Sequence, residues 1–339
     1  MRAEVPGRAV GGREHDEGWL RYVALAILAG LVLVVGSALG WWGGHRGAAG
    51  DPVAGAGGAT GPGAPEGAQA VDPSRFAPGS CERFAPTAGD RHLTVFLDAG
   101  HGGIDPGAVG RTESGATIYE GSLTLPVELD ATALLRAAGF TVVDSRTTDS
   151  TVLRLGPGDV SQGVLSLVGA HDEVAARDLC ANEAHADLLV GIYFDASTSP
   201  EAAGSLTTYD AARSFAAENL RFADLLQSSV LAAMNAKGWG IPNDGVLDDV
   251  GMGSNNGDPA TSKLAALAQQ YDHVMLLGPA MRGYFSDPSR MPGALIEPLY
   301  ITDPFEGSIA ASAEGQRVMA EGIARAVERY FETKGPERG

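Results

Sequence analysis

Four residues at or near the ends of predicted strands could together carry out metal-assisted hydrolysis. His101 follows an apolar run that begins at Val95, Tyr193 ends a second apolar run, and Glu297 ends a third. Glu120 begins a helical stretch after the first run. A histidine and a carboxylate can hold zinc, which lowers the pKa of a bound water molecule to about 7. A second carboxylate can then take the proton of that water.

The loop around His101 organises this pattern. Residues 98–108 read Asp-Ala-Gly-His-Gly-Gly-Ile-Asp-Pro-Gly-Ala and directly follow the first apolar run. Glycines let the chain turn sharply and leave room beside the imidazole for a metal or a substrate. In open α/β sheets, ligands bind at loops of this kind, at the carboxyl ends of strands. For the loop taken alone, a tight turn with an incidental histidine is the alternative.

The elements that would position these residues alternate between strands and helices. This alternation predicts an α/β three-layer sandwich, with a mostly parallel or mixed central sheet flanked by helices. Such a sheet would bring His101, Tyr193 and Glu297 to one edge. Pro126 fits the first turn of the first helix, and Gly139 ends that helix. The predicted strands cover 95–97, 141–143, 187–193, 205–209 (an outer strand), 274–277 and 293–297, and the predicted helices cover 120–138, 171–185, 214–237 and 312–331.

Residues 238–262 interrupt this alternation with a stretch rich in glycine, aspartate and asparagine. Its aspartates lack the spacing of a calcium-binding loop, so we expect a solvated loop. Such an excursion could shape or occlude a neighbouring groove. The aspartates concerned are Asp244, Asp248, Asp249 and Asp258.

The N-terminal region is predicted to be a membrane anchor. Residues 22–44 are apolar and uncharged, long enough to cross a bilayer as one helix. Arginines gather before this segment, so residues 1–21 should be cytoplasmic and the remainder should lie on the extracytoplasmic side. A cleaved signal peptide is the alternative, and it also exports the rest of the chain. The arginines are Arg2, Arg8, Arg13 and Arg21 before the segment and Arg46 behind it.

A linker should separate the anchor from the folded domain. Residues 45–80 are mostly Gly, Ala and Pro, a composition that cannot bury a core, whereas the domain is predicted to cover 91–333. Cys81 and Cys180 fall outside the membrane, where disulfides persist, so they either form a bridge or remain two buried thiols. The net charge of −18 argues against a nucleic-acid partner, because phosphate binding needs clustered Lys and Arg.

The region from His92 to Phe331 resembles the zinc-dependent N-acetylmuramoyl-L-alanine amidases of the amidase_3 type. Residues 96–108 follow the signature of that family, whose histidine, here His101, is a zinc ligand. Tyr119-Glu120 resembles the segment that supplies the second ligand. The stretch 296–304 resembles the segment whose glutamate, here Glu297, is the catalytic base. Arg177 and residues 181–187 match the stretch before the central strand.

One position departs from the family pattern. Where the family has its third zinc ligand, a histidine, this chain has Tyr193 within Gly-Ile-Tyr-Phe-Asp. Three explanations are open: a tyrosinate oxygen is the third ligand, Asp195 or a rearranged loop supplies an oxygen, or the metal site is weakened. Three other histidines are poor substitutes, because they lie on predicted helices or before a strand, away from the catalytic edge: His171, His185 and His273.

The resemblance implies a membrane-anchored or exported peptidoglycan hydrolase. Its substrate would be the amide between the lactyl group of N-acetylmuramic acid and L-alanine of the stem peptide. Zinc on His101 and Glu120 would activate water, and Glu297 would act as general base and then acid. The altered ligand at Tyr193 motivates a second hypothesis, a catalytically impaired module that binds or regulates the cell wall. A zinc hydrolase of the same fold that acts on another amide is a third.

Overall fold

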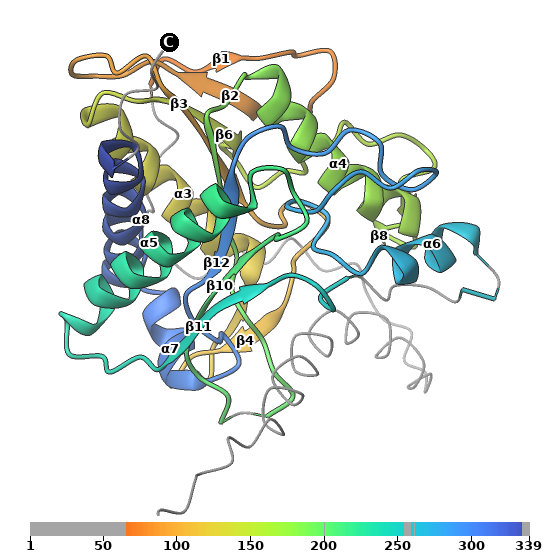
Figure 1. Cartoon of the computed structure of the whole chain (residues 1–339). Helices are drawn as coiled ribbons and strands as arrows, with labels where there is room; N and C mark the ends of the chain where they lie inside the picture. The colour runs from red at the N-terminus through yellow and green to blue at the C-terminus, as the bar shows by residue number, and fades with distance from the viewer. Residues whose placement is uncertain (1–65, 200, 254–258, 261, 334–339) are drawn as a thin grey trace, which may run out of the picture.

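Four parallel strands form the centre of the sheet in the computed structural model, which describes residues 66–199, 201–253, 259–260 and 262–333. The strands are fully or almost fully buried, because helices cover both faces of the sheet (Figure 1). Their carboxyl ends share one edge, as predicted. In spatial order they are β6 (Thr141–Arg146), β3 (Thr94–Ala99), β9 (Leu188–Ile192) and β12 (Gly293–Glu297).

One pair of strands extends the sheet on each side of this centre. Beyond β6 lie β2 (Ser80–Phe84) and then β1 (Gln69–Ala70), both paired antiparallel with their inner neighbours. Beyond β12 lie β10 (Ser205–Tyr209), which is antiparallel to β12, and β11 (Asn243–Asp248), which is parallel to β10. The eight-stranded sheet is therefore mixed.

Alternate side chains of the central strands fill a hydrophobic core on each face. Val95 and Leu97 of β3 join the core under the first helical layer, whereas Phe96 between them joins the other core. On the first face pack α3 (Glu120–Ala137), α5 (Ala216–Asn235) and α8 (Ala313–Thr333) (Figure 1), and α4 (Leu167–Glu183) contributes to the second core. The predicted three-layer sandwich is confirmed. The remaining elements are α6 (Lys263–Tyr271), α7 (Pro304–Ala310) and the hairpins of β4 (Val109–Arg111) with β5 (Thr117–Tyr119) and β7 (Val160–Ser161) with β8 (Val164–Leu165).

Several local predictions differ from the structure. Residues 274–277 form a turn, although Leu276 and Leu277 are buried, because this apolar run packs into the second core without pairing with a strand. Residues 238–262 are not wholly a solvated loop, since β11 lies among them and makes β10 an inner strand. Pro126 lies inside α3, since that helix begins at Glu120.

The folded part of the chain includes residues before position 91. Strand β2 carries Cys81, which forms a disulfide with Cys180 of α4, so the bridge predicted as one of two options is confirmed. None of the helices among the described residues is both long and apolar enough to cross a membrane. The anchor predicted at 22–44 lies outside the described residues, as does the first part of the predicted linker.

Candidate active site

His101 and Glu120 meet at the carboxyl edge of the central strands. His101 Nε2 lies 3.2 Å from Glu120 Oε2. The loop that brings them together turns sharply, because His101 has a φ of 60° and Gly102 a φ of 120°. Two ligands that each lie about 2 Å from a tetrahedral zinc ion are separated by roughly 3.3 Å. The spacing and the donor types of this pair therefore fit zinc.

Backbone amides hold the Glu120 carboxylate toward the imidazole. Ala108 N donates to Oε2 at 2.9 Å, and Phe194 N, just after β9, donates to Oε1 at 3.0 Å. Glu120 is also the first residue of α3, where the helix dipole favours a negative charge. Contacts from two segments, the loop after β3 and the residue after β9, thus fix this side chain, which is almost fully buried.

Asp105 fixes the other side of the His101 ring. Its Oδ2 lies 2.8 Å from His101 Nδ1, and its Oδ1 accepts a hydrogen bond from Gly107 N at 3.1 Å. A carboxylate on Nδ1 leaves Nε2 directed at the ligand position, as in many metal-binding histidines. No role for Asp105 was predicted from the sequence. Its position four residues after His101, in a Gly- and Pro-containing turn, was the available signal.

The carboxylates of Glu120 and Asp105, on either side of the His101 ring, favour a positive charge at this position. Burial alone would lower the pKa of His101, but Glu120 and Asp105 outweigh it and raise the pKa to about 10. Burial would likewise raise the pKa of Asp105, but the imidazolium lowers it to about 2. This preference for positive charge suits a divalent metal ion.

Glu297 lies at the same edge, at the end of β12. Its pKa is raised well above the usual value, first by burial and then by Asp195 and Glu120, while His101 acts in the opposite direction. The pKa of Asp195 is raised to about 7, again mainly by burial, with a further increase from Glu120. The structure therefore groups His101, Glu120, Asp195 and Glu297, as the strand order predicts.

Tyr193 makes its hydrogen bond in another direction. Its hydroxyl donates to Asp98 Oδ2 at 3.0 Å, and its ring meets the His101 ring edge-on at 5.6 Å between centroids. Burial, followed by the charge of Asp98, raises the pKa of the Tyr193 phenol well above its ordinary value. In this arrangement the side chain is a neutral phenol that flanks the His101 ring and binds a neighbouring carboxylate.

Asp98 belongs to a buried ionic network beneath the site. Arg177 Nη1 lies 2.6 Å from Asp98 Oδ1, and Arg177 Nη2 lies 2.9 Å from Glu173 Oε1. The same guanidinium donates to the backbone carbonyls of Ala99 and His101. Arg177 thereby fixes the backbone of the His101 loop. Arg177 could be identified from the sequence only as part of the family resemblance, because its contacts depend on residues distant in the sequence.

Comparison with known proteins agrees with this geometry. The family model Amidase_3, described as N-acetylmuramoyl-L-alanine amidase, matches residues 95–329. The chain belongs to this family. Amidases of this family are peptidoglycan hydrolases, and the family is generally zinc-dependent.

Two curated relatives and one solved structure illustrate the match. AmiC of Neisseria meningitidis is 26% identical over 74% of this chain and 55% of its own length, so the chain spans about half of that relative. AmiA of Escherichia coli is 26% identical over 70% of this chain and 75% of its own length. The CwlD amidase from Clostridioides difficile, solved in complex with the GerS lipoprotein, has a TM-score of 0.52 at 18% identity. That match covers 71% of this chain and 98% of CwlD. This last likeness supports the fold.

Proposed function

We propose that this chain hydrolyses the amide between the lactyl group of N-acetylmuramic acid and L-alanine of the peptidoglycan stem peptide. The observation that carries the proposal is the His101–Glu120 pair, 3.2 Å apart, with the Glu297 carboxyl at the same sheet edge. Family membership supports the bond that is cleaved.

The position of each residue indicates its proposed role. His101 Nε2 and Glu120 Oε2 would hold Zn²⁺, with Asp105 orienting the imidazole and two backbone amides orienting the carboxylate. When bound, zinc supplies a Lewis acid and lowers the pKa of water. Asp195 lies two residues after Tyr193, so it is the carboxylate of this group closest in sequence to the position of the family's third ligand. Burial raises the pKa of its side chain, and a cation bound nearby would favour its ionised form.

Glu297 would transfer the proton. A general base takes a proton from the attacking water and then gives it to the leaving amine nitrogen, which requires a carboxyl with a pKa above its ordinary value. Burial and the neighbouring carboxylates provide that condition for Glu297.

A test of this role compares two glutamate variants of the full chain. Glu297→Gln should reduce release of new L-alanine amino termini from peptidoglycan by at least about 100-fold, because general acid–base catalysis contributes on that order. Glu314→Gln, an exposed position in an ion pair with Lys237, is the matched control and should retain the activity. Wild-type turnover in Glu297→Gln with unchanged metal content would refute the assignment.

Tyr193 motivates a second candidate function. Because its hydroxyl is engaged by Asp98, the site would have two firm protein ligands and depend on a nearby carboxylate for a third. A chain with weak zinc affinity would act as a wall-binding or regulatory module. A folded chain that sediments with peptidoglycan but releases no L-alanine termini at saturating Zn²⁺ would favour this alternative.

For localisation, we propose that residues 22–44 anchor the chain in the cell membrane, with the folded domain on the wall side. The apolar segment and its flanking arginines support this orientation. Protease added to intact spheroplasts should digest the folded domain, and the domain should remain with the membrane fraction after a high-salt wash. A domain found free of the membrane after that wash would support a cleaved signal peptide instead.

A further inference from the structure

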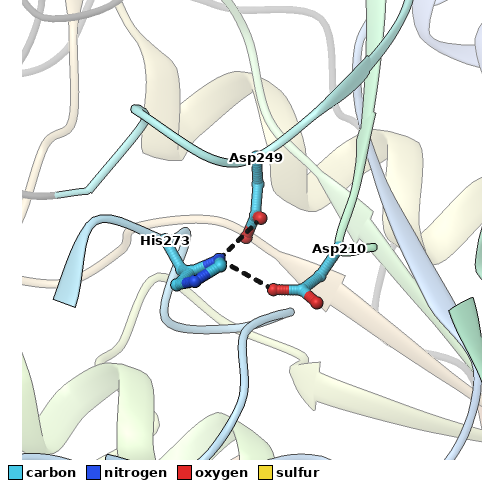
Figure 2. Close-up of side chains that lie close together, drawn as sticks. All are labelled: Asp210, Asp249 and His273. Atoms are coloured by element: carbon cyan, nitrogen blue, oxygen red, sulfur yellow. Dashed lines mark hydrogen bonds and ion pairs between the residues drawn. The ribbon is translucent and has the colours of Figure 1, made fainter. Parts of the chain in front are cut away.

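A second cluster of potential metal ligands lies outside the proposed active site. It consists of Asp210, Asp249 and His273, whose side chains converge in Figure 2. His273 Nδ1 lies 2.9 Å from Asp210 Oδ2 and 2.9 Å from Asp249 Oδ1. Both aspartates are fully buried, and His273 is partly buried.

The hydrogen bonds of this cluster are incomplete. Asp210 Oδ1 accepts from Ala212 N, and Asp249 Oδ2 accepts from Val274 N. The two remaining carboxylate oxygens both face His273 Nδ1, but one N–H group can donate well to only one of them. Within this cluster, Asp210 Oδ2 is a buried oxygen without a hydrogen-bond partner, one of six such side-chain atoms among the described residues. An unpaired buried carboxylate oxygen is costly, and a bound cation would offset that cost.

The nearby Arg213 does not supply that cation by direct contact. Its guanidinium donates to the carbonyls of Leu277 and Gly278 and to Ser289. These bonds hold the turn that follows His273. The guanidinium adds positive charge near Asp210 and Asp249, but its recorded hydrogen bonds go elsewhere.

The sheet topology separates this cluster from the proposed active site. Asp210 follows β10 and Asp249 follows β11, and these two strands are parallel to one another. Strand β10 is antiparallel to β12, with Leu206 opposite Glu297. Asp210 is four residues beyond Leu206, roughly 13 Å along the strand. The cluster therefore lies at the sheet edge opposite to His101 and Glu120.

We propose that Asp210 Oδ2, Asp249 Oδ1 and His273 Nδ1 form a second divalent-metal site, of the class that binds Zn²⁺. One imidazole and two carboxylates suit zinc-like ions, whereas Ca²⁺ and Mg²⁺ prefer sites made only of oxygen ligands. The ion would join the ends of β10 and β11 to the segment after α6. The site is thus structural, and it is independent of the proposed amide hydrolysis.

The test is the zinc content of the full chain after loading with Zn²⁺ and removal of free metal. His273→Gln and Asp210→Asn should each lose about one equivalent relative to wild type. His171→Gln is the matched control, because His171 is also partly buried and pairs with the adjacent Asp172. Its zinc content should be unchanged. Unchanged zinc in both His273→Gln and Asp210→Asn would overturn the proposal.

A second variant keeps the test decisive if those substitutions impair folding. His101→Gln removes a ligand of the proposed active site but leaves the second cluster intact. It should retain about one equivalent of zinc, and Zn²⁺ should still raise its melting temperature. A His101→Gln chain that is folded but binds no zinc would show that the second site does not exist. Failure of the proposed function would give a different result: the zinc content of His101→Gln would equal that of wild type.

Discussion

At the scale of single residues, the candidate site depends on how side chains are oriented by their neighbours. The placement of His101, Glu120 and Glu297 at one sheet edge could be predicted from the sequence, because each lies at or just after a strand end or at a helix start. The direction of the Tyr193 hydroxyl could not be predicted. It depends on Asp98, which is 95 residues from Tyr193 and is itself bound by Arg177, 79 residues away. Contacts of that range are set by the packing of the whole sheet.

Tyr193→Phe tests whether the phenol is a metal ligand. The variant removes one hydrogen bond to Asp98, so we expect the free energy of unfolding to fall by about 1–2 kcal/mol. Because the hydroxyl does not face the His101–Glu120 pair in hydrogen-bonding geometry, zinc content at the site should be retained. Metal analysis together with urea unfolding measures both quantities. Loss of one zinc equivalent at unchanged stability would instead identify Tyr193 as a ligand.

Asp144 predicts a specific pH dependence of stability. This fully buried carboxyl accepts a hydrogen bond from Thr132, and burial raises its pKa from 3.8 to about 8. Between these values the folded chain binds a proton that the unfolded chain lacks. Stability therefore falls as pH rises through this window, by up to about 1.4 kcal/mol per pH unit.

In Asp144→Asn this contribution is absent, because the amide is neutral at every pH. Relative to wild type, the variant should gain stability steadily as the pH is raised from 5 to 8, measured by urea unfolding. Asp287→Asn, an exposed carboxylate paired with Arg290, is the control and should run parallel to wild type. If the stability of Asp144→Asn also ran parallel to that of wild type between pH 5 and 8, this would contradict the raised pKa of Asp144.

At the scale of elements, the strands that carry the site and β10 were predicted well, whereas the outer strands β1, β2 and β11 were not. Strand β12 has the predicted bounds, and β3 and β9 differ by a few residues, because buried parallel strands are continuous apolar runs. Strand β11 reads Asn-Asp-Gly-Val-Leu-Asp and is half-exposed, so its composition is that of a loop. Its pairing with β10, a tertiary contact, makes it a strand.

The loop between β3 and α3 gives a prediction at this scale. At Gly107 an added Cβ would lie 2.7 Å from the His101 ring and 2.8 Å from Glu120 Oε2. Gly107→Ala should therefore separate this pair and abolish zinc binding at the candidate active site. Gly115→Ala is a matched control, because Gly115 also has a positive φ but open space around it. It should cost about 1–2 kcal/mol of stability and keep the zinc.

At the scale of the whole molecule, a covalent link joins an outer strand of the sheet to a helix that packs on it. The Cys81–Cys180 bridge connects β2 with α4, across a sequence separation of 99 residues. The pairing was one of two options from the sequence, since only two cysteines are present and both follow the predicted membrane segment. Which option holds depends on distance in the fold, and only the structure supplies it.

Replacing both cysteines by alanine should lower the free energy of unfolding by up to about 4–5 kcal/mol, because the unfolded chain gains the entropy of an open loop. Urea unfolding of the full chain measures the loss. Dithiothreitol should destabilise wild type by a similar amount and have no effect on the double variant. Equal stability of oxidised wild type and the double variant would contradict a stabilising role.

The central claim is that this member of the amidase family cleaves peptidoglycan with a metal held by His101 and Glu120. Digestion of purified peptidoglycan with the full chain tests this claim most directly. The measured quantity is the appearance of new L-alanine amino termini, with and without a zinc chelator. We predict release that the chelator stops and added Zn²⁺ restores. Release that persists in the chelator, with zinc shown to be removed, would contradict the account.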